Sequence, residues 1–225
     1  MTISTLTGAL LILLPVLFNL IFFLLQRSFE YPDILRKPPH EVLERFRLGG
    51  ARLLTLWYSF MLTSLVFILL AILLPQVIGP GSALFVVFAT TVGVLAGLLQ
   101  TLGLIRWPFL VPLLARIYTD PAASQATRDS AVVVFQAFHR YAGVAIGEHL
   151  GYLFTSLWTL LIAVTMTQSP LFPAWLGWLG LIPAAGIFLG VFEEAGFKAA
   201  GAINAISYIL WSLWLIAMGI FLLAA

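Results

Sequence analysis

The chain has 225 residues, of which 62% are hydrophobic and only 9% are charged. A soluble domain carries about 25% charged residues, so a chain this apolar has too little polar surface to cover itself in water. The composition therefore excludes an ordinary soluble protein and indicates an all-α, polytopic membrane protein. Cysteine is absent, which excludes disulfides, thiolate metal sites and a cysteine nucleophile.

Apolar runs predict six transmembrane helices, at about 6–25, 53–74, 82–104, 146–167, 175–192 and 203–223. Runs of this length cross a hydrocarbon core of roughly 30 Å at about 1.5 Å per residue. The first run lacks a basic residue before it and a small-residue cleavage site after it, so we expect a retained span rather than a signal peptide. The six spans form one transmembrane domain over residues 1–225.

The segments beside spans one to four predict short interfacial helices. Residues 41–46 suit a surface helix in which Glu41 and Arg45 pair across one turn. Residues 109–118 are too few to span, so they form either a kinked extension of span three or a helix in the interface. Residues 131–138 run along the membrane surface or rise toward it. In the last charged segment, Glu194 and Lys198 are also spaced as a pair.

The distribution of basic residues predicts the orientation. All 11 lysines and arginines fall in or beside the segments 27–52, 105–145 and 193–201. The connections 76–81 and 168–173 have none, and neither does either terminus. By the positive-inside rule, the three basic segments face the cytoplasm and both termini lie outside. With a net charge of only +2, these short segments suit anionic lipid headgroups better than nucleic acid.

Small residues recur at helix-contact spacing in three places. One is Gly93-x-x-x-Gly97 and another is Gly186-x-x-x-Gly190. The longest begins just before the fourth span and runs along it. Its small side chains recur every four residues, at Gly143, Gly147, Gly151, Thr155 and Thr159. Such faces let the backbones of two membrane helices approach closely.

Ionisable and aromatic residues stand beside that longest face. On span four we expect Glu148, His149, Tyr152 and Thr155 to face Asn204, Tyr208 and Trp211 on span six. The i, i+4, i+7 spacing on each helix would line a pocket with a carboxylate and an amide at its mouth and aromatic rings inside. Alternatively, the Tyr, Trp and Thr side chains simply pack between helices, and Glu148 pairs with Arg106 or Arg140.

Other kinds of site have less support. His139 and His149 lie about 80° apart on one helix by the 3.6-residue period, which argues against a haem held between them. A zinc site that catalyses hydrolysis needs about three protein ligands, and the H-E-x-x-H spacing typical of such sites is absent. Glycine-rich phosphate loops and serine nucleophile elbows are absent too. The sequence therefore predicts no catalytic residues, no metal and no cofactor.

Several phrases resemble an uncharacterised family of bacterial six-span membrane proteins, known as a domain of unknown function. They are Tyr31-Pro-Asp-Ile-Leu-Arg, Gly147-Glu-His-Leu-Gly-Tyr, Phe172-Pro-Ala-Trp-Leu-Gly-Trp-Leu-Gly180 and Tyr208-Ile-Leu-Trp-Ser-Leu-Trp214. The resemblance implies six spans in a bacterial inner membrane. It implies no activity and no catalytic residues.

Two functions follow as expectations. The first is a non-enzymatic protein that binds a lipophilic small molecule, a lipid or another membrane protein between its helices, near the cytoplasmic side. The second is a proton-coupled transporter or intramembrane enzyme that uses Glu148. The first is favoured because a transport path usually needs more intramembrane polarity than this chain offers.

Overall fold

The computed structural model describes residues 2–79 and 82–224, and within them every regular element is helical. In chain order these elements are α1 (Ile3–Phe29), the 3₁₀ turn η1 (Asp33–Arg36), α2 (Pro39–Val77), α3 (Ala83–Leu104), α4 (Arg106–Phe109), α5 (Val111–Tyr118), α6 (Gln125–Phe138), the π-helix η2 (His139–Leu150), α7 (Gly151–Met166), α8 (Ala174–Gly190) and α9 (Ala200–Ala224).

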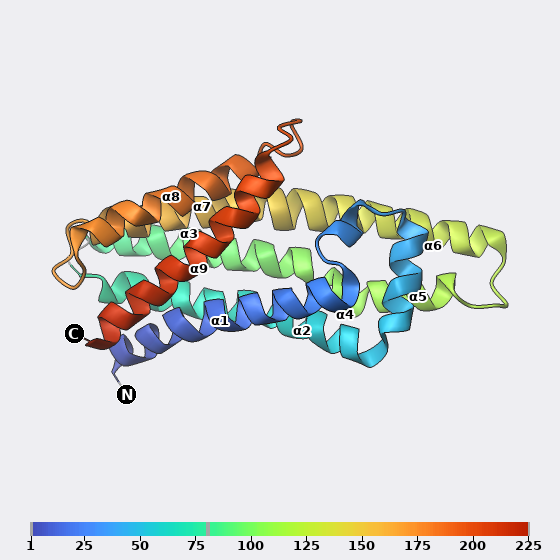
Figure 1. The fold of residues 1–225 in the computed structure, drawn as a ribbon, viewed down its shortest axis with the longest axis horizontal. Coiled ribbons are helices and arrows are strands. Elements are labelled where there is room, and N and C mark those ends of the chain that lie inside the picture. Colours follow the sequence, from blue (N-terminus) through green and yellow to red (C-terminus); the bar gives the residue numbers. More distant parts are fainter. Residues whose placement is uncertain (1, 80–81, 225) are drawn as a thin grey trace.

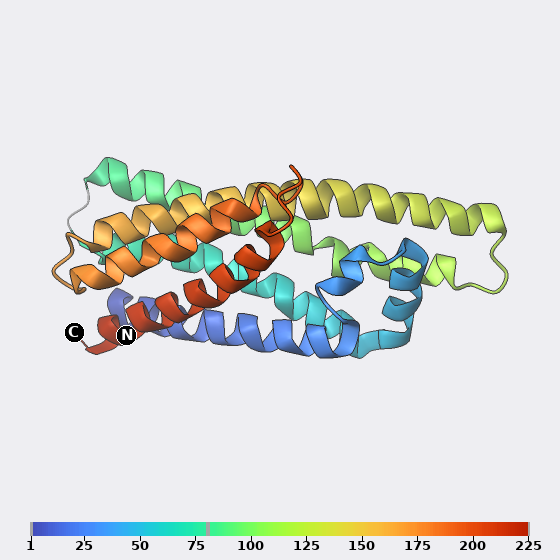
Figure 2. The same cartoon turned by 45° about the horizontal axis from the view of Figure 1, so that its top comes forward.

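The molecule is elongated and has two halves (Figures 1 and 2). In the terminal half, which holds both chain ends, α1, α2, α3, α7, α8 and α9 lie side by side. The basic half consists of η1, the first part of α2, and α4, α5 and α6. Because α8 and α9 meet through residues 191–199 near the middle of the long axis, neither helix reaches into the basic half.

Five helical stretches are long and apolar enough to cross a membrane: Ile3–Phe29, Pro39–Val77, Ala83–Tyr118, Gln125–Met166 and Ala200–Ala224. The remaining apolar helix, α8, has 17 residues. The protein is thus an all-helical membrane protein, and every apolar run expected to span lies on a helix.

The helices of the basic half differ from those expected between the spans. The short helix expected at 41–46 is the start of α2, and Gly50, at φ 54° and ψ −149°, turns this first part across the long axis. A glycine is suited to this turn because it adopts positive φ without a steric penalty. The expected pair of Glu41 and Arg45 is present at 2.8 Å.

The long rod from Gln125 to Met166 begins earlier than the expected start at 131. Ser124 caps it, because its hydroxyl accepts a hydrogen bond from the Thr127 amide at 3.2 Å. The rod joins α6, η2 and α7 without a break and runs through both halves (Figures 1 and 2). Its residues therefore connect the interior of the terminal half to the surface of the basic half.

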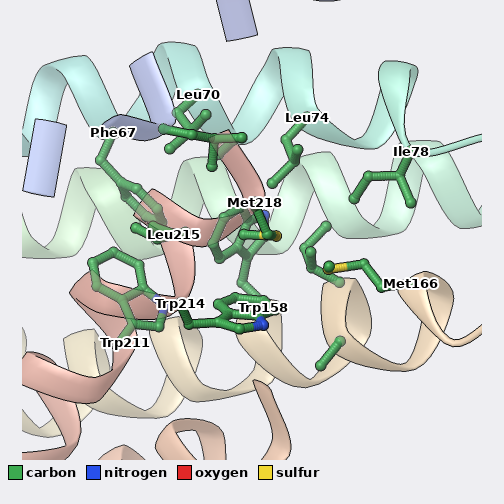
Figure 3. Packing of buried hydrophobic residues seen from close by; sticks show 14 of the residues in the cluster. Phe67, Leu70, Leu74, Ile78, Trp158, Met166, Trp211, Trp214, Leu215 and Met218 are labelled. Atoms are coloured by element: carbon green, nitrogen blue, oxygen red, sulfur yellow. The ribbon is translucent and has the colours of Figure 1, made fainter. Parts of the chain in front are cut away.

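Each half has its own apolar core. In the terminal half, Phe67, Trp158, Trp211 and Trp214 pack with aliphatic side chains of α1, α2, α3, α8 and α9 (Figure 3). In the basic half, the indoles of Trp57 and Trp107 stack with ring centroids 4.3 Å apart and planes at 8°. These two buried indoles belong to the same apolar core as side chains of α5 and α6, so the basic half is packed like a folded domain.

All three small-residue faces lie at helix contacts. A Cβ on Gly93 would come within 2.5 Å of the Trp158 side chain, and a Cβ on Gly186 within 1.8 Å of the Ser207 hydroxyl. On Gly147 it would lie 2.8 Å from the Cα of Gly103. These contacts admit no side chain larger than hydrogen without a shift, so the glycines set the helix spacing.

Candidate functional site

The small face of the long rod packs on α3 and α4. Starting from the basic half, Gly143 lies against the Arg106 guanidinium, Gly147 against Gly103, and Gly151 beside Gln100. The next member, Thr155, accepts a hydrogen bond from Gln100 Nε2 at 2.8 Å. This order places Glu148 at the point where the rod crosses α3.

The π-helix decides which way Glu148 and His149 face. In an α-helix, Glu148 would share a face with Ala137, because eleven residues make about three turns of 3.6. A π turn holds more residues, since its hydrogen bonds run from i to i+5. Over His139–Leu150 the wider turn therefore rotates Glu148 away from the face of Ala137 and brings His149 toward it.

Glu148 is half-buried and has no ion-pair partner within 4.0 Å in the described part of the chain. Arg106 lies at the same crossing, because Gly103, whose carbonyl it binds, packs on Gly147. Arg106 itself is only 7% exposed and donates from Nη1 to the Gly103 carbonyl, and its Nε has no partner among the described residues. The two charged side chains thus belong to the same helix crossing but form no salt bridge within 4.0 Å in the described residues.

Deeper in the terminal half, aromatic rings bridge α7 and α9. The ring centroids of Tyr152 and Tyr208 are 5.9 Å apart, as are those of Tyr208 and Trp211. The Trp211 indole donates to Thr159 Oγ1 at 2.9 Å, rather than meeting Thr155 as the sequence suggested. Asn204 is buried against Gly190 of α8, and its Oδ1 has no partner in the described chain.

A cavity of about 20 Å³ lies among α1, α2, α3 and α9, where it is bordered by Thr63, Gln100, Tyr208 and Trp211. That volume suits about one water molecule. Beyond it, toward the chain ends, the apolar cluster of Figure 3 fills the bundle. Of the residues expected to line a pocket between spans four and six, Tyr208 and Trp211 border this cavity.

A larger hollow lies on the outside of the rod. It is an open groove of about 440 Å³, lined by Ala137, Arg140, Tyr141, Val144, Ala145, His149 and Glu194. Six of these seven residues belong to the rod, and Glu194 comes from the segment between α8 and α9. We call this hollow the π-helix groove. Its volume is in the range of small-molecule sites.

Ion pairs hold the 191–199 segment beside the groove. Arg140 pairs with Glu194, and Arg36 of η1 pairs with Glu193 at 3.1 Å. Glu194 therefore pairs with an arginine of the rod, and the expected Glu194–Lys198 pair is not met in the described residues. Neither arginine proposed as a partner of Glu148 forms that bond: Arg140 binds Glu194, and Arg106 binds a backbone carbonyl.

The comparisons with known proteins identify a family. The family described as "Domain of unknown function (DUF4386)" matches residues 6–224. The chain belongs to this family. No curated protein matches the chain, and no solved structure matches it. Family membership agrees with the resemblance drawn from the aromatic-rich phrases.

The expected site residues therefore separate into two groups. Tyr152, Thr155, Tyr208 and Trp211 lie inside the terminal half as a polar and aromatic layer. Asn204 is buried against α8, and Glu148 is half-buried beside the α3 crossing. His149 is exposed and lines the π-helix groove on the outside.

Sequence reasoning missed three contributors. Gln100 and Thr159 complete the hydrogen bonds of the interior, and Glu194 closes one side of the groove. The polar Gln100 inside an apolar run was an available signal. In the described residues, no group of three or more His, Asp or Glu side chains is placed to hold a metal ion.

Proposed function

We propose that this protein is a six-span protein of a bacterial inner membrane that binds a lipophilic small molecule or lipid in the π-helix groove and catalyses no reaction. The observation that carries the proposal is the groove itself, the largest of the hollows described above, at about 440 Å³. Its apolar wall at Val144 and Ala145 suits a hydrocarbon chain, and its polar wall suits a headgroup.

The proposed membrane position follows from helix lengths. If α8 is the fifth of the six spans, its 17 residues cover about 25 Å, close to the thickness of a hydrocarbon core. The bilayer then encloses the terminal half. The basic half then extends from the cytoplasmic interface into the cytoplasm, because α6 continues the axis of the rod away from the terminal half, and both termini lie outside. In this position the groove opens at the cytoplasmic boundary.

The test is whether purified protein retains a lipid in the groove. Ala145→Trp fills the groove from an exposed position of the rod. We expect native mass spectrometry to show lipid bound to the parent protein and lost from Ala145→Trp. The matched control is Leu160→Trp, which adds the same ring at a 42%-exposed position of α7. Equal lipid retention in all three proteins would overturn the proposal.

A second candidate is proton exchange at Glu148, and one observation favours it. Glu148 is half-buried without an ion pair in the described residues, as a proton-exchanging carboxylate requires. The apolar cluster across the other part of the bundle counts against a through path. A pH-dependent flux into proteoliposomes that is abolished in Glu148→Gln would favour this candidate over the first.

A further inference from the structure

The lining of the π-helix groove has a polar part and an apolar part, which suits an amphiphilic ligand. Arg140, Tyr141 and His149 supply hydrogen-bond donors, whereas Val144 and Ala145 are apolar. The wider turn of the π-helix brings these side chains to one face. A molecule that fits both walls has an acidic or hydrogen-bond-accepting head and a hydrocarbon tail.

The depth of the groove favours a lipid over a soluble ligand. Glu194 follows the end of α8 by four residues, and it pairs with Arg140. Arg140 is therefore level with the end of an apolar helix, where lipid headgroups lie if α8 spans the bilayer. Val144, Ala145 and His149 follow along the rod toward α7, which is the direction of the hydrocarbon core.

The Arg140–Glu194 pair is an exposed one. The Arg140 side chain is 70% exposed and that of Glu194 is 42% exposed. An exposed ion pair contributes little to stability, because water and salt screen it. A lipid phosphodiester presents two non-bridging oxygens and one negative charge to a guanidinium, as a carboxylate does, so it can take the place of Glu194 on Arg140. Exchange of Glu194 for a phosphate on Arg140 therefore costs the protein little.

We propose that the π-helix groove binds a net-anionic phospholipid, with the lipid phosphate replacing Glu194 on Arg140 and an acyl chain lying along Val144 and Ala145. This inference rests on the proposed function and names its ligand class. Glu194 then acts as an internal competitor: it occupies the headgroup position while the groove is empty and gives up Arg140 when the lipid enters.

The test titrates full-length protein in detergent with phosphatidylglycerol or with phosphatidylcholine of the same acyl chains, followed by native mass spectrometry. We expect phosphatidylglycerol to bind more tightly. Arg140→Gln should lower its affinity about tenfold, because a charge-assisted bidentate contact is lost. Glu194→Gln should raise it about threefold, because the competing exposed pair is removed. Arg47→Gln removes an exposed arginine outside the groove and should change neither value.

The outcomes separate the two proposals. Equal binding of both lipids, unchanged in Arg140→Gln but lost in Ala145→Trp, would overturn the anionic-headgroup inference and leave lipid binding in the groove intact. Retention of both lipids in Ala145→Trp would overturn the groove as the site and both proposals with it. Glycerol phosphate should not displace the lipid. Displacement at equal concentration would mean that the acyl chain contributes nothing, and would overturn the lipid as ligand.

Discussion

Gly103 of α3 and Gly147 of the π-helix touch backbone to backbone. A Cβ on Gly147 would lie 2.8 Å from the Cα of Gly103, and a Cβ on Gly103 would lie 2.5 Å from the Cα of Gly147. No real Cβ tolerates such distances, and the atoms in the way belong to the main chain, which is costly to move. This crossing fixes the depth and direction of the neighbouring Glu148.

Replacing Gly147 by leucine should therefore destabilise the protein by roughly 1–3 kcal/mol, in the range of overpacked cores. We expect a lower midpoint of thermal unfolding for the purified variant. Ala145→Leu is the matched control, since it adds a side chain two residues away at an exposed position of the same π-helix. If Gly147→Leu melts with the parent protein, the α3 crossing does not depend on glycine.

Arg106 and Glu148 should be coupled in stability although they form no direct salt bridge. Removing either charge leaves the other with less compensation at the buried crossing, so each single variant, Arg106→Gln or Glu148→Gln, should be less stable. The double variant should lose about 1 kcal/mol less than the sum of the two. A double-mutant cycle on unfolding measures this coupling. As a control, the losses of unfolding free energy in Arg47→Gln and Glu148→Gln should simply add in the double variant. A non-zero coupling energy between Arg47 and Glu148, or none between Arg106 and Glu148, would contradict the prediction.

The orientation is testable because the chain has no cysteine of its own. A cysteine at Gln168 should react with an impermeant thiol reagent in intact cells, and one at Ala122 should react only after lysis. Both positions are exposed, whereas the neighbouring Ser169 is buried and donates to the Ile78 carbonyl, which makes it a poor labelling site. The reverse labelling pattern would place the termini in the cytoplasm.

The pKa of Glu30, just after α1, is held below its ordinary value of 4.5 by hydrogen bonds from Lys37 and Arg45. A lowered folded-state pKa adds stability above the unfolded-state pKa and loses it as the pH falls through the folded-state value. The parent protein should therefore melt above Glu30→Gln at neutral pH, and the gap should shrink below about pH 4.5. A gap that stays constant to pH 3 would show that the charge of Glu30 is not the cause.

Much of the fold was predictable because a membrane helix is recognised from the length and apolar composition of one continuous run of residues. Apolar runs of sufficient length coincide with α1, α2, α3, α7 and α9, since a spanning backbone must satisfy its own hydrogen bonds, and the shorter apolar run at 175–192 coincides with α8. Glycines at four-residue spacing also identified the contact face of the rod, since close approach requires small side chains in any partner. The family was also predictable, because the resemblance rested on short stretches of sequence that can be read without the structure, and the family match over residues 6–224 confirmed it.

The partner of each charge was decided only by the tertiary structure. Spacing along one helix suggested Glu194 with Lys198 and left Glu148 with either Arg106 or Arg140, but Arg140 lies beside the 191–199 segment and binds Glu194. Likewise, a 3.6-residue period would turn Glu148 toward the face that carries Ala137, which lines the groove. The wider π turn faces it inward and exposes His149 instead. Composition sets which residues lie in the membrane. The winding of twelve residues against α3 sets which of them meet the interior and which line the groove.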